Sequence, residues 1–346
     1  MSVTRTERPL IIPIFIPNQG CPHQCIYCQQ EKITDQSKTS VNGLYIKQIL
    51  DKAKKSVHFS SSKEREVAFY GGTFTNLPFS RMRELLEAVN PYLNQGLFRS
   101  IRVSTRPDEI DGKRLDLMKD LGVSTVELGV QSMDDEVLRL SRRGHTADDT
   151  VKSVGLLRRY GFKVGVQLMP GLPGDSEEKF RRTIAEVVKL KPDMARLYPA
   201  IVINGTELAL WYNENRYQPL RLEAAVRICQ ESCIRLESMG IPVIRMGLMS
   251  SASLLREGQV VAGPWHTAFG FLVRSGIHRK RIEPFLPKSG VASKIGIRAP
   301  HREISLIRGY KNQGLGLIEK KIGAKVKYVN PDDSIPSGRI EVDIVK

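Results

Sequence analysis

Three cysteines lie close together near the start of the chain, in the stretch Gly20-Cys21-Pro22-His23-Gln24-Cys25-Ile26-Tyr27-Cys28. Thiolates are the preferred ligands of soft metals and of iron–sulfur clusters. Three thiols do not complete the closed four-ligand shell of a structural zinc site. A 4Fe-4S cluster held by three cysteines would leave one iron open to a small molecule. A zinc loop completed by His23 or by a distant residue, and cysteines without a metal, stay open as alternatives.

The chain has two other cysteines, Cys229 and Cys233. They are four residues apart on a helix predicted over residues 222–238, so they share a face. We interpret them as small apolar core residues, with a second metal or redox pair as the alternative. An odd number of cysteines, three of them clustered, argues against a disulfide framework and indicates a reducing compartment.

The cysteine loop directly follows an apolar run over residues 10–16, which predicts a buried strand. Five more strands are predicted along the chain, at residues 67–70, 100–103, 124–130, 163–169 and 194–198. Predicted helices lie between them. This alternation is typical of βα units that build a parallel sheet. A further strand is predicted over residues 241–246, after helices at 204–212 and 222–239.

Polar and glycine-rich residues follow the predicted strands rather than precede them. Gly71-Gly72-Thr73 follows the second strand, Ser104 the third and Gln131 the fourth. In a parallel barrel or an open α/β sheet, ligands bind at the carboxyl ends of the strands. The sequence therefore predicts a binding site at that edge, beside the cysteine loop.

The cysteine spacing after the first strand, with the double glycine after the second, resembles the radical S-adenosylmethionine (radical SAM) superfamily. This resemblance implies an α/β fold, a partial (βα)6 TIM-like barrel, and an enzyme. Its cofactors would be a 4Fe-4S cluster on Cys21, Cys25 and Cys28 and S-adenosyl-L-methionine on the open iron. One electron, from a reductant such as flavodoxin or ferredoxin, would cleave the sulfonium to a 5′-deoxyadenosyl radical that abstracts hydrogen from the substrate.

The same resemblance implies roles for other residues, although no catalytic side chain is identified. Tyr27 would lie near the adenine, and the backbone of Gly71 and Gly72 would bind the methionine ammonium, with Thr73 where the superfamily has glutamate. Arg143 is a candidate for the methionine carboxylate. The candidates for ribose hydroxyls and other polar groups of the cofactor are Ser104, Glu127 and Gln131. The residues expected to wall the adenine are Val166, Leu168 and Tyr198.

Within the superfamily, residues 8–245 resemble most the radical SAM core of the catalytic subunit of Elongator, which modifies the tRNA wobble uridine. The stretches that carry this resemblance are Gly71-Gly72-Thr73-Phe74, Thr105-Arg106-Pro107-Asp108, Val126-Glu127-Leu128-Gly129-Val130-Gln131-Ser132, Arg143-Gly144-His145-Thr146, Met169-Pro170-Gly171-Leu172-Pro173-Gly174 and Leu197-Tyr198-Pro199. The remaining residues, about 100, cannot hold the acetyltransferase-like domain of that subunit. We therefore expect this chain to abstract hydrogen from its substrate, as the Elongator subunit does, but not to transfer an acetyl group.

The chain is strongly basic, with a formal net charge of +16, which favours a polyanionic partner. Residues 273–346 hold sixteen Lys and Arg against seven Asp and Glu. Residues 306–329 resemble the helix–loop–helix–strand of a KH domain, whose Gly-x-x-Gly loop binds single-stranded RNA. Here Gly309 is followed by Asn312, which tolerates a left-handed backbone, and Arg308 and Lys311 would face phosphates. A small α+β cap over the active site is the alternative.

We therefore predict a radical SAM core with a helical extension over residues 1–275 and a small basic α+β domain, KH-like or a cap, over residues 276–346. The expected substrate is an RNA base, with tRNA first. A tetrapyrrole or another small metabolite, as in coproporphyrinogen dehydrogenases, is the second hypothesis. A non-catalytic RNA-binding protein with a structural metal loop is the third. Neither a membrane span nor a cleavable leader is evident, so a cytoplasmic location is expected.

Overall fold

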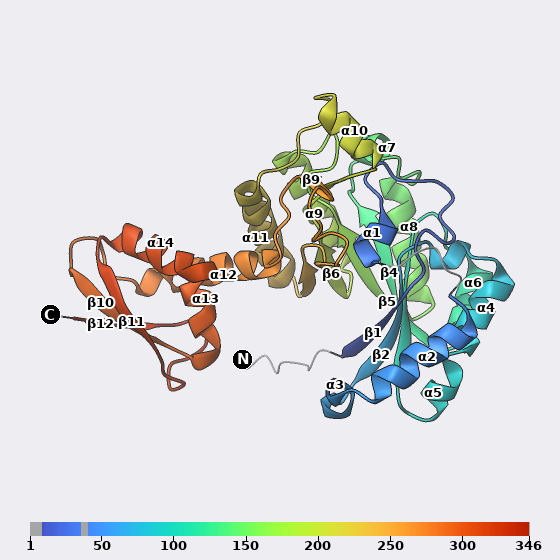
Figure 1. The fold of residues 1–346 in the computed structure, drawn as a ribbon, viewed down its shortest axis with the longest axis horizontal. Helices are drawn as coiled ribbons and strands as arrows, with labels where there is room; N and C mark the ends of the chain where they lie inside the picture. The colour runs from blue at the N-terminus through green and yellow to red at the C-terminus, as the bar shows by residue number, and fades with distance from the viewer. Residues whose placement is uncertain (1–8, 36–40, 346) are drawn as a thin grey trace.

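The computed structural model describes residues 9–35 and 41–345. Its main sheet has seven strands in the order β1-β2-β3-β4-β5-β6-β8, and every neighbouring pair is parallel. The sheet curls into a half-barrel with β1 and β8 at its edges (Figure 1). The strands are β1 (Leu10–Phe15), β2 (Arg65–Tyr70), β3 (Ser100–Thr105), β4 (Val123–Gln131), β5 (Lys163–Leu168), β6 (Met194–Leu197) and β8 (Val243–Met246). The predicted partial barrel is confirmed, and the strand predicted over residues 241–246 is its last strand.

Helices connect these strands, and most of them cover the convex face of the sheet (Figure 1). They are α2 (Gly43–Lys54), α3 (Val57–Ser61), η1 (Phe74–Asn76), α4 (Phe79–Glu87), α5 (Asn90–Asn94), α6 (Gly112–Asp120), α7 (Asp135–Leu140), α8 (Ala147–Arg159), α9 (Glu177–Leu190) and α11 (Leu222–Ser238). Side-chain caps begin several of them: Asn42, Asp111, Thr146 and Ser176 each accept a bond from a first-turn N–H.

The segment between β2 and β3 forms two consecutive helices, where the spacing of its apolar residues predicts a single helix over residues 80–93. α4 ends at Glu87, and α5 begins at Asn90 with a proline in its first turn. Proline has no N–H to donate, so Pro91 suits the start of a new helix better than the middle of a long one.

Alternate side chains along each strand point to opposite faces of the sheet. Those on the convex face are apolar and pack under the helices in one core, which includes Ile14, Phe69, Val103, Val126 and Val164. Those on the concave face include charged residues, namely Glu66, Arg102, Glu127, Arg196 and Arg245. The half-barrel therefore has an apolar outer core and a polar interior.

A second layer of short elements lies over the carboxyl ends of the strands (Figure 1). It consists of α1 (Gln30–Thr34), α10 (Glu207–Asn213) and a two-stranded antiparallel sheet of β7 (Val202–Ile203) and β9 (Val260–Ala262). The Leu208 N–H donates to the Ile26 carbonyl, 2.9 Å away, so α10 is tied directly to the cysteine loop.

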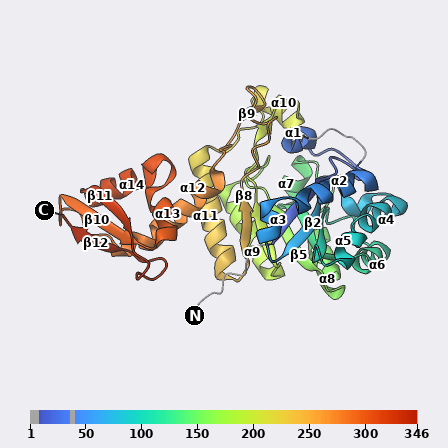
Figure 2. The same cartoon turned by 60° about the horizontal axis from the view of Figure 1, so that its bottom comes forward.

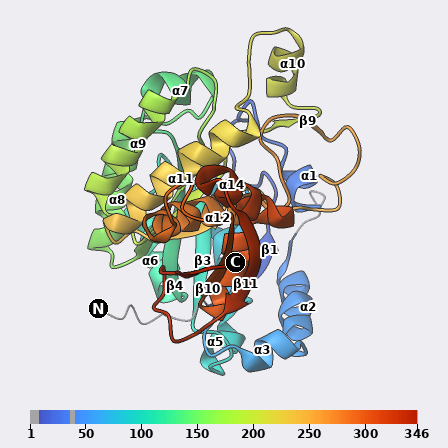
Figure 3. The ribbon, with the colours of Figure 1, turned by 90° about the vertical axis from the view of Figure 1, so that its left-hand side faces the viewer.

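The C-terminal residues form a separate small sheet with the order β11-β10-β12. β10 (Lys294–Ala299) is parallel to β11 (Lys325–Pro331) and antiparallel to β12 (Glu341–Ile344). Between β10 and β11 lie η3 (His301–Glu303), α13 (Ile304–Arg308), η4 (Tyr310–Asn312) and α14 (Gln313–Ile322). This C-terminal module has its own core and lies to one side of the half-barrel (Figure 2). Figure 3, seen from that side, shows it in front of α11.

One helix joins the two parts. α12 (Phe269–Ile282), followed by η2 (Glu283–Phe285), begins in the half-barrel core with Phe269 and Val273 and ends in the module core with Ile282. The domain boundary predicted between residues 275 and 276 therefore falls inside a continuous helix. Within the described part of the chain, no helix is both long and apolar enough to span a membrane.

Candidate active site

A cavity of about 390 Å³ lies on the concave face of the sheet, at the carboxyl ends of the strands. It brings together most of the residues that the sequence analysis selected as cluster or cofactor contacts. These are Cys21, Cys25, Tyr27, Cys28, Gly71, Gly72, Thr73, Ser104, Glu127, Gln131, Arg143 and Tyr198. Segments that are more than 170 residues apart in sequence thus share one wall because parallel strands end at the same edge.

Two of the predicted adenine contacts do not line this cavity. Val166 and Leu168 are buried in the apolar core under the helices on the convex face. The residue between them, Gln167, lines the cavity instead, because neighbouring strand residues face opposite sides. The structure therefore places Gln167 on the cavity wall, and Val166 and Leu168 away from it.

The double glycine makes a turn that only glycine fits. Gly71 and Gly72 have φ values of 77° and 66°, in the left-handed region. A Cβ atom at Gly72 would lie 2.3 Å from the Gln19 carbonyl oxygen, in the loop before the cysteines. The next residue, Thr73, is fully buried, and its hydroxyl lies 3.4 Å from the Cys21 sulfur. The turn after β2 is thus packed directly against the cysteine loop.

The side chain of Gln30 joins these two loops, although Gln30 is not among the residues predicted from the sequence to form the site. Its Oε1 atom accepts hydrogen bonds from the Asn18 N–H at 2.7 Å and from the Gly72 N–H at 2.8 Å. Nothing in its spacing distinguishes it from Gln29, since the contact depends on how the loops pack. Gln30 therefore fixes the double glycine relative to the chain that leads into the cysteines.

Replacing Gln30 by leucine is expected to lower the free energy of unfolding of the half-barrel by about 2 kcal/mol or more, since two partly buried N–H groups lose their acceptor. Urea denaturation followed by circular dichroism measures this change. Gln29→Leu is the matched control, because the Gln29 side chain has no hydrogen bond with any described residue, and it should stay within about 0.5 kcal/mol of wild type. Equal stability of the two variants would contradict the role given to Gln30.

Arg143 lies beside the cysteine loop without a carboxylate partner. Its Nη1 atom is 3.1 Å from the Cys25 sulfur, and its Nη2 atom donates to the Gly129 carbonyl at 2.6 Å. Burial, followed by the neighbouring thiolates, raises the pKa of the Cys28 thiol to about 12, and burial also raises the pKa of Cys21. Burial thus favours the protonated form of the Cys21 and Cys28 thiols, and a bound metal cluster would have to displace their protons.

The three thiols share a wall but do not converge on one point. Among residues 9–35 and 41–345, no three His, Cys, Asp or Glu side chains are grouped to hold a single metal ion. His23, the suggested zinc ligand, has its Nε2 atom 2.9 Å from the Arg143 carbonyl oxygen. A cluster distributes its cysteine ligands over separate irons, so its thiols stand farther apart than the ligands of one ion.

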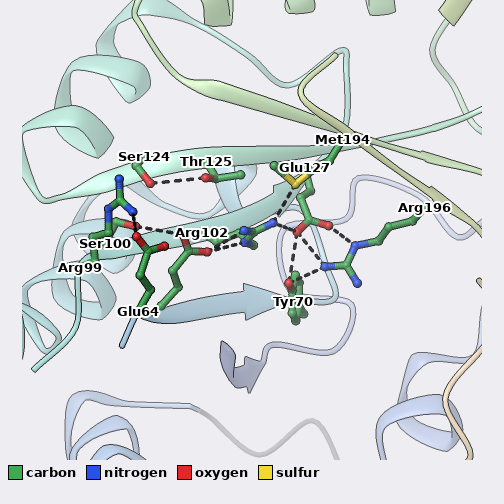
Figure 4. Close-up of polar contacts among 11 residues, drawn as sticks. Glu64, Tyr70, Arg99, Ser100, Arg102, Ser124, Thr125, Glu127, Met194 and Arg196 are labelled. Carbon is green, nitrogen blue, oxygen red and sulfur yellow. Dashed lines mark hydrogen bonds and ion pairs between the residues drawn. The ribbon is translucent and has the colours of Figure 1, made fainter. Parts of the chain in front are cut away.

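The floor of the cavity is a buried network of charges (Figure 4). Arg102 pairs with Glu66 at 2.6 Å and with Glu127 at 2.8 Å, and Arg196 pairs with Glu127 at 2.5 Å. Tyr70 also donates to Glu127, at 3.2 Å. Burial acts to raise the pKa of Glu127, but Arg196 and Arg102 outweigh it and hold that pKa below its usual value. Since these partners occupy both carboxylate oxygens, Glu127 supports the floor of the cavity.

Two other predicted cofactor contacts, Gln131 and Tyr198, also accept hydrogen bonds from neighbouring side chains. The Gln131 side chain accepts from Gln167 at 3.3 Å, and the Tyr198 hydroxyl accepts from Arg196 at 3.1 Å. Gln131 has φ of 65°, an uncommon backbone state for a residue other than glycine. Ser104 lines the cavity with no hydrogen bond to any residue in the described ranges, so its hydroxyl is available to a ligand.

The residues selected for RNA contact lie in the C-terminal module, on the loop between α13 and α14. Gly309 has φ of 67° and ψ of 178°, and Asn312 is left-handed with φ of 64°. Arg308 and Lys311 are exposed, and neither pairs with a carboxylate among the described residues. The ring of Tyr310 packs edge-on against His266, with centroids 4.7 Å apart, which connects this loop to the segment between β9 and α12.

Family models match two consecutive parts of the chain: "Radical SAM superfamily" over residues 15–187 and "Radical_SAM C-terminal domain" over residues 192–279. Among curated proteins, a tRNA uridine(34) acetyltransferase of Methanocaldococcus jannaschii is 29% identical over 257 residues, which cover 63% of this chain and 47% of that protein. The enzyme of the same name from Dehalococcoides mccartyi is 33% identical over 230 residues, covering 58% of this chain and 50% of that protein.

Human Elongator complex protein 3 is 26% identical over 252 residues, covering 60% of this chain and 46% of that protein. Among solved structures, the archaeal Methanocaldococcus infernus Elp3 with an N-terminal deletion has a TM-score of 0.58 and 25% identity, covering 78% of this chain and 63% of that chain. The chain spans about half the length of the curated relatives that it matches.

Proposed function

The chain belongs to the radical SAM superfamily, and from this premise we propose that it holds a 4Fe-4S cluster and S-adenosylmethionine in the described cavity and acts on an RNA base. Family membership and the Elongator-like relatives indicate an enzyme rather than a non-catalytic binding protein. The observation that carries the proposal is the shared wall of the cavity, where Cys21, Cys25 and Cys28 lie beside the double glycine and an arginine without a carboxylate partner.

The residues of this wall fit such a pair of cofactors. The hydroxyl of Tyr27 and the Nε atom of Arg143 are buried without a hydrogen-bond partner among the described residues. A buried polar atom without a partner costs free energy, so both atoms are suited to a ligand that completes their bonds. Because Gly71 and Gly72 have no side chains, a ligand beside the thiols can approach the backbone polar groups of this turn.

In this proposal the cysteines hold the cluster and Arg143 binds the methionine carboxylate. The bound pair would supply a 5′-deoxyadenosyl radical formed by one-electron cleavage of the sulfonium. The chain would position both groups, since Gln30 fixes the glycine turn beside the cysteine loop. The elements that lie over the strand ends would limit the access of water. A donor such as flavodoxin or ferredoxin belongs to the proposal, because this chemistry consumes one electron.

An RNA substrate is supported by the names of the relatives, which are tRNA uridine(34) acetyltransferases, and by the net charge of +16. A tRNA uridine is the first candidate. The test is anaerobic reconstitution with iron and sulfide, followed by dithionite and S-adenosylmethionine. We expect about four irons per chain and formation of 5′-deoxyadenosine. A colourless protein that binds neither iron nor S-adenosylmethionine would overturn the proposal.

The α13–α14 loop is proposed as an RNA contact outside the cavity. Its support is the exposed, unpaired Arg308 and Lys311 beside a backbone that Gly309 and Asn312 keep compact. Cations that neutralise phosphates release counterions, so binding then depends on salt.

Exchanging both Arg308 and Lys311 for glutamine is expected to weaken binding of a ten-nucleotide oligouridylate and to reduce the slope of log affinity against log salt by about 1.4, since each contact with single-stranded RNA contributes about 0.7. Fluorescence anisotropy at several salt concentrations measures both. The matched control is Lys113→Gln/Lys119→Gln on α6, which removes the same charge on the far side of the half-barrel (Figure 1). If both double variants gave the wild-type slope, this loop would not contact RNA.

A further inference from the structure

The cavity extends well beyond the cysteine loop. It is also lined by Ile11, Pro13 and Phe15 of β1 and by Arg245 of β8, the two edge strands of the open sheet. It therefore reaches across the concave face, from β1 at one edge of the sheet to β8 at the other. The cofactor contacts proposed above leave Phe15, Tyr70 and Arg245 without an assigned ligand.

Four arginines line this cavity: Arg106, Arg143, Arg196 and Arg245. Arg106 pairs with Asp108 at 2.6 Å, and Arg196 pairs with Glu127 at 2.5 Å. Arg143 lies at the Cys25 sulfur. Arg245 is exposed and makes no hydrogen bond or ion pair with any residue of the described ranges.

The strand register explains why Arg245 has no partner. It lies beside Arg196 in the paired strands β6 and β8, so its closest neighbour on this face is another cation. β8 is an edge strand, and no further strand of this sheet brings a carboxylate from the other side. Within the described chain the only carboxylate that lines the cavity is Glu127, which Arg102 and Arg196 already neutralise.

The wall of this cavity also carries aromatic rings. Phe15, Tyr70 and Tyr198 all line it, and the rings of Phe15 and Tyr70 are 6.4 Å apart between centroids. Aromatic rings offer surfaces on which nucleobases stack, and the planar guanidinium of arginine matches the oxygens of a phosphate. An arginine without a carboxylate partner can bind the phosphate of a nucleotide, and aromatic rings in the same cavity can stack on its base.

We propose that Arg245 binds a phosphate of the RNA nucleotide that enters the cavity, next to a base held against the rings of Phe15 and Tyr70. This inference rests on the proposed RNA substrate and goes further by assigning the residue that holds the nucleotide. Arg245 thereby acts as a substrate-binding residue on the last strand of the half-barrel.

The test compares the binding of two ligands by three proteins: the parent, Arg245→Gln and a control variant. Binding of a labelled triuridylate, and of the same trinucleotide with neutral methylphosphonate linkages, is measured by anisotropy under anaerobic conditions with reconstituted protein. All proteins carry Arg308→Gln/Lys311→Gln, so that the α13–α14 loop does not dominate. Arg245→Gln is expected to weaken binding of the phosphate ligand about ten-fold, the scale of one hydrogen bond to a charged group, and to leave the neutral ligand unaffected.

Arg235→Gln is the matched control, because Arg235 is an exposed arginine on α11 that does not line the cavity. It should bind both ligands as the parent protein does. An Arg245→Gln protein that binds triuridylate as tightly as the parent, or that loses both ligands equally, would overturn this assignment alone. A parent protein that carries its cluster but binds no RNA would overturn the proposed RNA substrate together with the role of Arg245.

Discussion

Alanine at any one of Cys21, Cys25 and Cys28 is expected to reduce bound iron from about four atoms per chain to less than about one, and to abolish formation of 5′-deoxyadenosine. Each thiol is one of three on the cavity wall, and no other Cys of the described chain lines the cavity to replace it. The measurements are iron and sulfide content, visible absorption and product formation after anaerobic reconstitution. Far-ultraviolet circular dichroism shows whether each variant is folded.

Cys229 and Cys233 provide the matched control for these variants. Both are fully buried in the core of the half-barrel, on α11, and neither lines the cavity. Cys229→Ala and Cys233→Ala should keep the full iron content, with at most a modest loss of stability from the small cavity that each leaves. Iron retained at wild-type level in Cys28→Ala, or lost equally in Cys229→Ala, would contradict the ligand assignment.

Glutamine in place of Glu127 is expected to destabilise the half-barrel by about 3–5 kcal/mol, because the buried Arg102 and Arg196 would lose the negative charge that they share. In a domain of this size that corresponds to a fall in Tm of roughly 10 °C. Thermal unfolding followed by circular dichroism measures the shift. The buried network tolerates this loss poorly, since no other carboxylate in it can reach Arg196 (Figure 4).

Glu64 offers the matched control, because it also pairs with an arginine, Arg99, but at the exposed surface (Figure 4). Exposed ion pairs contribute about 0–1 kcal/mol, so Glu64→Gln should change Tm by about 2 °C or less. A Glu127→Gln protein that melts within 2 °C of wild type would show that the network does not support the cavity floor.

Much of the fold follows from local patterns. The alternation of apolar runs with amphipathic helices predicts a parallel sheet, and the structure has one, with strands in chain order. The resemblance to the radical SAM superfamily and to the Elongator core is confirmed by the family model and by the relatives. Cysteine spacing and a glycine pair are local features, so they can be recognised without knowledge of the packing.

The position of Val166 and Leu168 shows what the family resemblance did not decide. Along β5 the apolar Val164, Val166 and Leu168 alternate with Gly165 and Gln167. Only the packing of the helices on one face of the sheet shows which of the two sets lines the cavity. The role of Gln30 was missed for a similar reason, since its two partners belong to loops that are 12 and 42 residues away.

By itself the sequence determined the family, the alternation of strands with helices and the three clustered thiols, because each depends on residues that are neighbours in the chain. The order of the strands in the sheet came only from the structure. Only the tertiary structure decided which charges cancel. Glu66, Arg102, Glu127 and Arg196 lie on four different strands, and their pairing into a neutral floor depends on how the sheet curls. The same curl leaves Arg245 on an edge strand with no carboxylate beside it, which a count of charges along the chain does not reveal.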